Sequence, residues 1–359
     1  MKYHYYDYTE KLSLVLQKAR KGQAITIGFL GGSITQGCNP SVPENAYAVR
    51  TYNWLKEFLA PTEVRYINAG IGATGSLIGV HRMVEDLLQY KPDIIVVEFA
   101  ANDVPPTDGS KKSYESVIRG IIEHLPNTAI IELMMTLQDG TSAYAQQTQI
   151  GHHYKVPMVS YRQEVLNGIA AGEYTWEEIE TDEVHPNDRG HKIVADLLAN
   201  LFEVADKNKV SEDYHYEMPK EVLFSKKYSD GIILNRNNYR PLYTGSFYPC
   251  DDGFKSLCVG WKAKQCENNK ALVCKVVAKN IHLLYRKNVG EQMGIAEITI
   301  DYDKKLEVDS SFPNGWGDYA EVFMLLEEDA CREHIIEIKL KEGKATDTFT
   351  VLGLLVSKA

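Results

Sequence analysis

The order of apolar and amphipathic segments predicts two domains of different class in this chain of 359 residues. Up to about residue 205, short apolar runs alternate with stretches in which apolar residues recur every three or four positions. Such alternation is typical of an α/β domain with a doubly wound parallel sheet. Farther along, the apolar runs are short and bounded by turn residues, which indicates an all-β sandwich.

The first domain is predicted to alternate strands with helices. The predicted strands comprise residues 24–30, 64–68, 93–99, 129–135 and 156–161, most of them continuously apolar as in a parallel sheet. The predicted helices comprise residues 46–59, 76–88, 113–124, 163–171 and 188–202. In such a sheet ligands bind at the carboxyl ends of the strands, so functional side chains are expected in the loops that follow them.

A charged and polar stretch separates the two predicted domains. Residues 203–220 carry few apolar residues, which indicates a hinge. We therefore predict a first domain over residues 1–205, a linker over 206–220 and a second domain over 221–359. Strands of the second domain are expected at residues 231–234, 271–277, 295–300, 320–326, 334–340 and 349–356.

Composition and charge exclude several classes of protein. The chain has 49 acidic and 39 basic residues and a net charge of -10, which disfavours nucleic acid as a partner. No apolar stretch approaches the roughly 18 residues of a membrane span. The first residues lack the apolar run of a secretory signal, so a cytoplasmic protein is expected.

A candidate nucleophile follows the first predicted strand. Residues 31–35 read Gly-Gly-Ser-Ile-Thr, and the two glycines allow a tight turn that leaves the Ser33 hydroxyl uncovered at the sheet edge. The alternative is that Ser33 only caps a helix, because serine is a common N-cap residue. The motif alone does not decide between these two interpretations.

A second motif favours the nucleophile. Asp182 lies three residues before His185, so its carboxylate can reach Nδ1 of the imidazole while Nε2 faces a serine. Asp188 and Glu183 are alternative orienting acids. With Ser33 the pair supplies the groups of a catalytic triad in the chain order Ser, Asp, His.

Two further segments supply hydrogen-bond donors for an oxyanion. The glycine-rich segment 68–76 follows the second strand, and its backbone amides could stabilise a developing negative charge. Asn102 follows the third strand and offers a side-chain carboxamide at the same sheet edge.

These four blocks resemble the SGNH (GDSL-like) hydrolase superfamily, in the branch whose first block reads Gly-Gly-Ser-Ile-Thr. The resemblance covers about residues 22–205 and implies a flavodoxin-like three-layer sandwich. It implies Ser33 as nucleophile, Asp182 and His185 as its partners, and an oxyanion hole that includes Ser33 and Asn102. The family has a glycine where this chain has Ala73, so whether Gly72 or Ala73 supplies the remaining amide is open.

A dinucleotide-binding oxidoreductase is the rival from another class. Residues 70–75 match G-x-G-x-x-G between a strand and a helix, and Glu98 follows about 20 residues later. Against this reading, the motif follows the second strand rather than the first. It also leaves Ser33, Asn102 and the Asp182/His185 pair without a role.

The domain order resembles carbohydrate esterase family 17, in which an SGNH domain precedes a jelly-roll-like family 35 carbohydrate-binding module. The resemblance implies a carbohydrate acetylesterase acting on acetylated β-mannooligosaccharides; another acyl ester is the alternative substrate. Trp316 and Tyr319 are candidate sugar contacts, because aromatic rings stack on sugar faces. Catalysis by the triad needs no cofactor and no metal site is expected in the first domain. A structural calcium ion in the second domain and a homodimer stay open.

Overall fold

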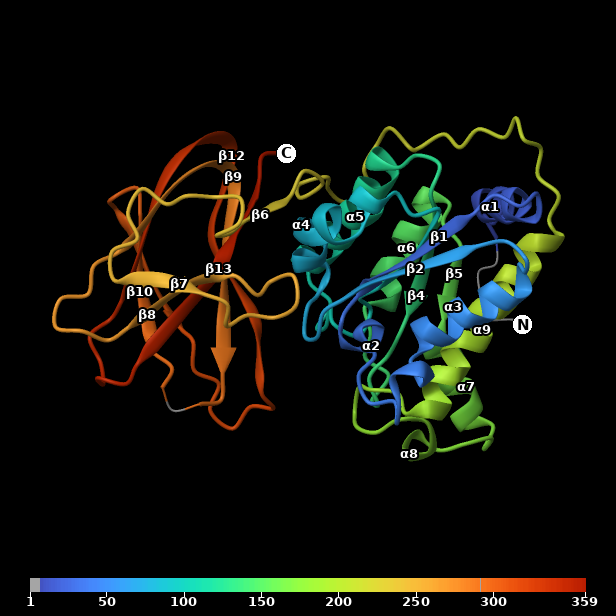
Figure 1. Cartoon of the computed structure of the whole chain (residues 1–359), viewed down its shortest axis with the longest axis horizontal. Coiled ribbons are helices and arrows are strands. Elements are labelled where there is room, and N and C mark those ends of the chain that lie inside the picture. Colours follow the sequence, from blue (N-terminus) through green and yellow to red (C-terminus); the bar gives the residue numbers. More distant parts are fainter. Residues whose placement is uncertain (1–6, 291) are drawn as a thin grey trace. The chain divides into compact units, whose positions relative to one another are not determined.

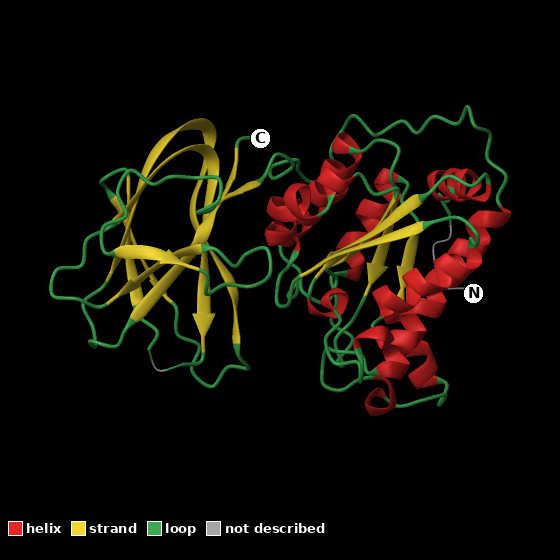
Figure 2. Cartoon of the chain, in the orientation of Figure 1, coloured by secondary structure: helices red, strands yellow, loops and turns green. Residues whose placement is uncertain are grey.

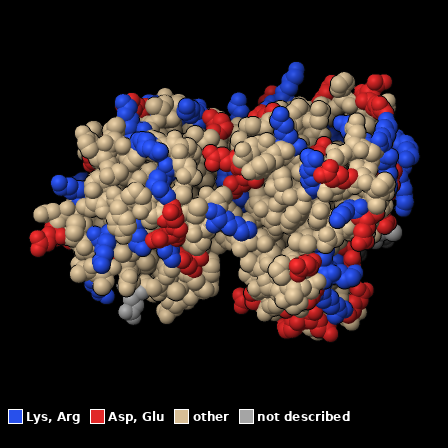
Figure 3. All heavy atoms as spheres, in the orientation of Figure 1, with Lys and Arg blue, Asp and Glu red and all other residues tan. Residues whose placement is uncertain are grey.

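The chain forms two compact units in its computed structural model, which describes residues 7–290 and 292–359. The first unit ends at Ser229 and the second spans Asp230–Ala359 (Figure 1). No helix of the described residues is both long and apolar enough to cross a bilayer. Figure 3 shows Lys and Arg side chains interspersed with Asp and Glu on the face in view of each unit.

The first unit is built on a parallel sheet with the strand order β2-β1-β3-β4-β5. Its strands are β1 (Ile25–Gly31), β2 (Val64–Gly70), β3 (Ile94–Glu98), β4 (Ala129–Met134) and β5 (Met158–Ser160). This order is that of a flavodoxin-like sheet, in which β2 and β3 lie on opposite sides of β1. The crevice at the carboxyl ends of β1 and β3 is therefore the expected place for a ligand.

Helices cover both faces of this sheet, as Figure 2 shows. They are α1 (Glu10–Arg20), α2 (Ser33–Gln36), α3 (Tyr47–Phe58), α4 (Ser76–Asp86), α5 (Asp108–His124), α6 (Tyr144–Tyr154), α7 (Tyr161–Ala170), α8 (Trp176–Ile179) and α9 (Asp188–Lys207). One apolar core joins the sheet to α1, α3, α7 and α9, and another joins it to α4, α5 and α6. The predicted doubly wound α/β fold is confirmed.

Four of these helices, α1, α2, α6 and α8, were not among those predicted from the sequence. Helix α1 has apolar residues at helical spacing, and these are buried: Leu12, Val15, Leu16 and Ala19. Helix α6 lacks that pattern, since its buried face includes Gln147, Thr148 and Gly151. Tertiary contacts rather than apolar periodicity therefore define α6.

The segment between α9 and the second unit packs on the first unit. The carboxylate of Glu115 in α5 accepts hydrogen bonds of 2.6–2.7 Å from the backbone N–H groups of Leu223, Phe224 and Ser225. The structure thus divides the chain at Ser229, whereas the sequence suggested a linker over 206–220 and a second domain from 221. A buried carboxylate of the first unit therefore anchors residues 223–225, which the sequence assigned to the second domain.

The second unit is an antiparallel β-sandwich, as predicted. Its strands are β6 (Ile232–Leu234), β7 (Phe247–Cys250), β8 (Gly260–Lys264), β9 (Leu272–Asn288), β10 (Ile295–Ile300), β11 (Lys304–Asp309), β12 (Asp318–Leu340) and β13 (Thr348–Ser357). They follow the order β11-β10-β12-β9-β13-β8-β7, and β6 pairs with β13. Two of the predicted strands, 320–326 and 334–340, belong to the single long strand β12. Its pairing with β9 shifts in register at two places between Met324 and Arg332.

Candidate active site

Ser33 is the first residue of α2, directly after β1. The turn that holds it leaves no room for a side chain at either of the two glycines before it. A Cβ on Gly31 would lie 2.2 Å from Thr35 Oγ1, and one on Gly32 would lie 2.1 Å from Asn102 Oδ1. The glycines predicted to allow a tight turn therefore bring Ser33 against the loop that follows β3.

Ser33, His185 and Asp182 form a continuous chain of hydrogen bonds. The Asp182 Oδ2 atom lies 2.8 Å from His185 Nδ1, so this nitrogen carries the proton and Nε2 is an acceptor. The Ser33 hydroxyl donates to Nε2 over 2.8 Å. The structure thus brings together the three residues that the sequence singled out, although 149 to 152 positions separate serine from the pair.

Hydrogen bonds within the loop before α9 fix the position of Asp182. Its Oδ1 atom accepts from the backbone N–H groups of Val184 (2.7 Å) and His185 (2.8 Å). The Trp176 indole donates to its carbonyl oxygen over 2.8 Å. Partial burial raises the pKa of Asp182, but the bonds from the His185 ring and the two amides outweigh this effect, and the pKa lies below its usual value.

Asp188, one of the alternative orienting acids, has a different partner. Its carboxylate accepts from the backbone N–H of Ser41 over 2.8 Å and from the Ser41 hydroxyl over 2.5 Å. It thus ties the loop after α2 to the start of α9. The geometry supports Asp182 and gives Asp188 an anchoring role.

The loop after β2 lies on the other side of Ser33. A Cβ on Gly72 would come within 3.9 Å of Ser33 Cβ, so this part of the backbone adjoins the nucleophile. The Gly72 N–H donates to Gln36 Oε1 over 2.6 Å. Ala73 has a φ of 57°, in the left-handed region that favours glycine. This conformation gives a physical reason for a glycine at the same place in the resembling family.

Buried carboxylates support both the nucleophile turn and the loop of Asn102. Glu98 at the end of β3 accepts from Thr35 Oγ1 over 3.0 Å. Asp103 accepts from the Ser76 N–H at the start of α4 over 2.9 Å. Burial raises the pKa of Glu98 and of Asp103 to about 7 in each case. Sequence reasoning missed these supporting roles; a charged residue at the end of an apolar strand was the available signal.

The glycine-rich segment 70–75 packs closely against the nucleophile turn. A Cβ on Gly70 would lie 2.3 Å from the backbone nitrogen of Gln36, so this glycine permits the close packing of β2 on α2. Glu98, the acid of the rival fingerprint, is fully buried and bonded to Thr35. The contacts of this segment therefore favour the hydrolase interpretation over the oxidoreductase.

His191 has a structural position near the site. Its Nδ1 accepts from the Tyr47 N–H over 3.2 Å, and its Nε2 donates to the Cys38 carbonyl over 3.1 Å. Burial lowers its pKa to about 4, so the ring stays neutral and keeps this pattern. Within residues 7–290 and 292–359, no three His, Cys, Asp or Glu side chains are placed to hold a metal ion.

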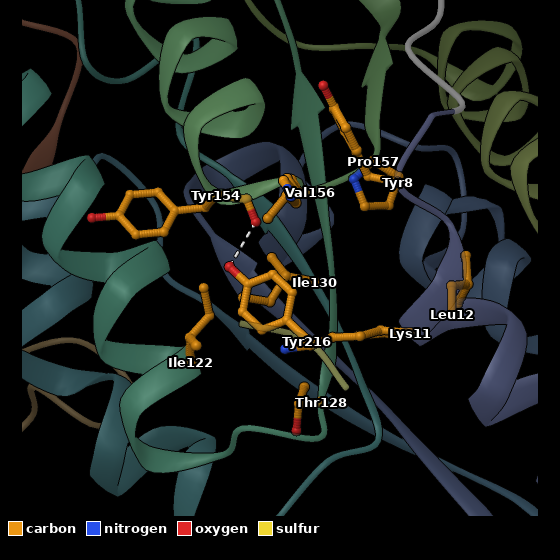
Figure 4. Close-up of a pocket in the computed structure, with 12 residues that line it drawn as sticks. Tyr8, Lys11, Leu12, Ile122, Thr128, Ile130, Tyr154, Val156, Pro157 and Tyr216 are labelled. Atoms are coloured by element: carbon orange, nitrogen blue, oxygen red, sulfur yellow. Dashed lines mark hydrogen bonds between the residues drawn. The ribbon is translucent and has the colours of Figure 1, made fainter. Parts of the chain in front are cut away.

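A small hollow lies at the opposite end of the sheet, beside the amino ends of β4 and β5 (Figure 4). Tyr8, Lys11, Tyr154 and Tyr216 are among its lining residues. The Tyr216 hydroxyl donates to the Tyr154 carbonyl over 2.8 Å, and Lys11 Nζ lies 4.0 Å from the centre of the Tyr216 ring. Burial lowers the pKa of Lys11 to about 8. The hollow shares no residue with the Ser33 site.

The candidate sugar contacts lie in the second unit. Trp316 is 68% exposed, and its ring centre lies 4.9 Å from that of Tyr319 at a tilt of 32°. Phe312 contacts both rings edge-on, and the Tyr319 hydroxyl donates to Glu321. The two predicted residues therefore belong to one aromatic cluster, in which Trp316 is exposed and Tyr319 and Phe312 are half-buried.

A hydrolase of the SGNH fold is the class that this sheet and this hydrogen-bonded chain indicate. Residues 29–193 match the model of the GDSL-like Lipase/Acylhydrolase family. The crystal structure of a two-domain esterase (CEX) active on acetylated mannans is 30% identical, with a TM-score of 0.90 over 98% of this chain and 96% of that chain. A structure of such an esterase co-crystallized with mannopentaose is also 30% identical, with a TM-score of 0.88 over 97% and 95% of the chains. No curated protein sequence matches significantly.

The chain belongs to the GDSL-like lipase/acylhydrolase family and is a carboxylic ester hydrolase with an SGNH fold. The likeness to the two-domain esterase extends through the β-sandwich as well as the α/β unit. This agrees with the domain order that the sequence predicted.

Proposed function

We propose that this esterase removes O-acetyl groups from carbohydrate, and that acetylated β-mannooligosaccharides are its substrates. The observation that carries the catalytic part is the Ser33–His185–Asp182 chain, with 2.8 Å at each of its two links. Similarity of both units to an esterase active on acetylated mannans supports the substrate.

In the first step Ser33 Oγ attacks the acetyl carbonyl carbon. His185 Nε2 takes the hydroxyl proton, and Asp182 stabilises the resulting imidazolium through Nδ1. Negative charge develops on the carbonyl oxygen, where backbone amides of the Ser33 turn and of the Gly72–Ala73 loop, together with Asn102, would donate hydrogen bonds. Collapse breaks the bond between the acetyl carbon and the sugar oxygen, and His185 gives the proton to this oxygen, so that the sugar leaves with a free hydroxyl.

In the second step water hydrolyses the acetyl-enzyme. His185 accepts one proton of the water as its oxygen attacks, and the same donors stabilise the second oxyanion. The proton then passes to Ser33 Oγ as acetate leaves. Every group in these steps is a side chain or backbone amide of this chain, so the proposed cycle requires no metal or cofactor.

The aromatic cluster of the second unit is proposed to bind the sugar chain. The exposed Trp316 ring and the half-buried Tyr319 ring beside it offer apolar faces on which pyranose rings can stack. Calorimetric titration with unacetylated mannopentaose tests this: Trp316→Ala should weaken binding about fivefold, in line with a stacking contact worth about 1 kcal/mol. Tyr302→Ala is the matched control, because Tyr302 is also exposed, at 74%, and lies outside the cluster. Equal affinities of the two variants would show that Trp316 does not contact the sugar.

A panel of substrates tests the proposed specificity. The enzyme is incubated with acetylated mannooligosaccharides, acetylated xylooligosaccharides and a lysophospholipid, and the release of acetate and fatty acid is measured. The highest kcat/KM is expected for the mannooligosaccharides. A higher kcat/KM for the xylooligosaccharides would mean that the substrate is acetylated xylan rather than mannan. Release of fatty acid without acetate would refute the assignment of a carbohydrate substrate.

Removal of the nucleophile tests the mechanism. Ser33→Ala should lower kcat by about six orders of magnitude, as expected for loss of a triad serine. Ser13→Ala is the control, because the Ser13 hydroxyl only donates to the Thr9 carbonyl within α1. Substantial acetate release by purified Ser33→Ala would exclude Ser33 as the nucleophile.

A further inference from the structure

Gln36 connects the two segments that border the nucleophile. It is the last residue of α2, three positions after Ser33, and its side chain is exposed whereas Ser33, Ile34 and Thr35 are buried. Its carboxamide oxygen accepts the Gly72 N–H over 2.6 Å, a short and favourable contact. An exposed side chain thus reaches from the nucleophile turn to the loop after β2.

This bond distinguishes the two amides that could serve the oxyanion. The Gly72 N–H already donates to Gln36, and a backbone N–H makes one good hydrogen bond at a time. The Ala73 N–H has no hydrogen-bond acceptor among the residues that the structure describes. The amide of Ala73 is therefore the one available to a ligand.

The neighbouring bonds hold the loop on both sides of Ala73. The Ile71 N–H donates to the Gly31 carbonyl over 3.1 Å, and the Thr74 hydroxyl donates back to the Ile71 carbonyl over 2.7 Å. Between these anchors Ala73 adopts its φ of 57°, which is unfavourable for alanine by about 1–2 kcal/mol. A conformation of this kind persists only where surrounding contacts fix it, and the bond from Gly72 to Gln36 holds the residue directly before Ala73.

We propose that Gln36 is a positioning residue, whose carboxamide oxygen holds the Gly72 amide so that the Ala73 N–H is the backbone donor of this loop to the oxyanion. The inference rests on the proposed esterase mechanism and assigns the amide that the sequence left open. Gln36 does not contact the reacting atoms in this scheme. It acts through the orientation of the peptide between Gly72 and Ala73.

Two substitutions of Gln36 distinguish the effect of its hydrogen-bond acceptor from the effect of its side-chain size. Gln36→Met keeps the length but has no oxygen, and kcat should fall about tenfold because a misplaced donor stabilises the transition state less well. Gln36→Glu keeps an acceptor for the Gly72 N–H and should retain kcat within about threefold. Gln149→Met is the control: Gln149 is exposed on α6 and bonds only to the Ala145 carbonyl.

A comparison of two substrates tests whether Gln36 instead contacts the sugar directly. A positioning role predicts the same fall in kcat for 4-nitrophenyl acetate and for acetylated mannooligosaccharides, with KM nearly unchanged. A rise in KM confined to the oligosaccharides would overturn the inference, and so would equal kcat values for Gln36→Met and Gln36→Glu. Activity of the wild type and its loss in Ser33→Ala test the esterase mechanism separately, so failure of one proposal is distinguishable from failure of the other.

Replacement of single backbone amides by esters tests the assignment directly. Lactic acid in place of Ala73 removes that N–H and should lower kcat by about 10²–10³, as loss of an oxyanion donor does. Glycolic acid in place of Gly72 removes the donor to Gln36 and should reproduce only the smaller effect of Gln36→Met. The reverse order of effects would assign the oxyanion donor to Gly72 and refute the proposal.

Discussion

The two sides of the Ser33 site differ in how they are built. The acid–base side consists of one loop in which Asp182 and His185 lie three residues apart, and their side chains are 46% and 25% exposed. The oxyanion side combines separate segments after β1, β2 and β3, with buried Glu98 and Asp103 behind them. Local hydrogen bonds therefore organise the first side, whereas the packing of distant segments organises the second.

Because local hydrogen bonds hold the loop of Asp182 and His185, this difference predicts that the charge of Asp182 can be removed without changing the shape of the loop. In Asp182→Asn the carboxamide oxygen can still accept the Val184 and His185 amides, so the loop should keep its shape. The charge that fixes the imidazole tautomer is lost, and kcat should fall by about 10³–10⁴. Acetate release at saturating substrate measures the effect.

Asp188→Asn is the matched control for this loss of charge. Its carboxylate binds Ser41 rather than His185, so kcat should stay within about threefold of the wild type. Comparable losses in both variants would show that the orienting acid has not been identified.

The oxyanion side should respond less strongly to loss of one group, because several donors share the charge. Asn102→Ala should lower kcat by about 10²–10³ with little change in KM, since the carboxamide acts mainly in the transition state. Steady-state kinetics with 4-nitrophenyl acetate measure both constants. If Asn102→Ala retained more than a tenth of the wild-type kcat, Asn102 would not be a donor in the oxyanion hole.

The sequence was informative where the chemistry is local. The spacing of Asp182 and His185, and the glycines before Ser33, identified three residues that the structure joins by hydrogen bonds. Alternating apolar runs likewise predicted the sheet and most of its helices. The bond between Gln36 and Gly72 joins residues 36 positions apart and depends on how β2 packs against α2, so no local pattern encodes it.

The same limit applies to the segment before the second unit. Residues 206–220 are polar enough to look like a linker, and a second domain was expected from residue 221, but the carboxylate of Glu115 in the first unit binds the backbone of Leu223, Phe224 and Ser225. A single buried acid on α5 could not be matched to these amides without the fold. Boundaries set by such contacts are therefore less predictable than elements set by periodicity.

Buried acids make the oxyanion side sensitive to pH. The pKa of Glu98 is about 7 in the folded chain, above its usual 4.5, so the folded state binds a proton that the unfolded state releases between these values. The free energy of unfolding should therefore fall as pH rises from about 4.5 to about 7, by roughly 2–3 kcal/mol for this group. Glu98→Gln cannot ionise and should show a smaller fall.

Urea unfolding at pH 5 and pH 8 measures this difference, with esterase activity as the probe of the first unit. Part of the fall should remain in Glu98→Gln, because burial also raises the pKa of Asp103 to about 7. Glu63→Gln is the control, since Glu63 is exposed and bonded to Arg65. Identical pH dependence of Glu98→Gln and the wild type would mean that Glu98 stays ionised when buried.

The smallest expected effect separates conformational strain from catalysis on the oxyanion side. Ala73→Gly should raise the free energy of unfolding by about 0.5–1 kcal/mol, because glycine adopts a φ of 57° without steric strain. The same freedom should loosen the Ala73 N–H and lower kcat severalfold. Lys91→Gly is the control: Lys91 has a φ of 51° and lies away from the site, so stability should rise while kcat stays constant. If Ala73→Gly gained stability without losing activity, fixation of this amide would have no catalytic value, and the two sides of the site would differ only in burial.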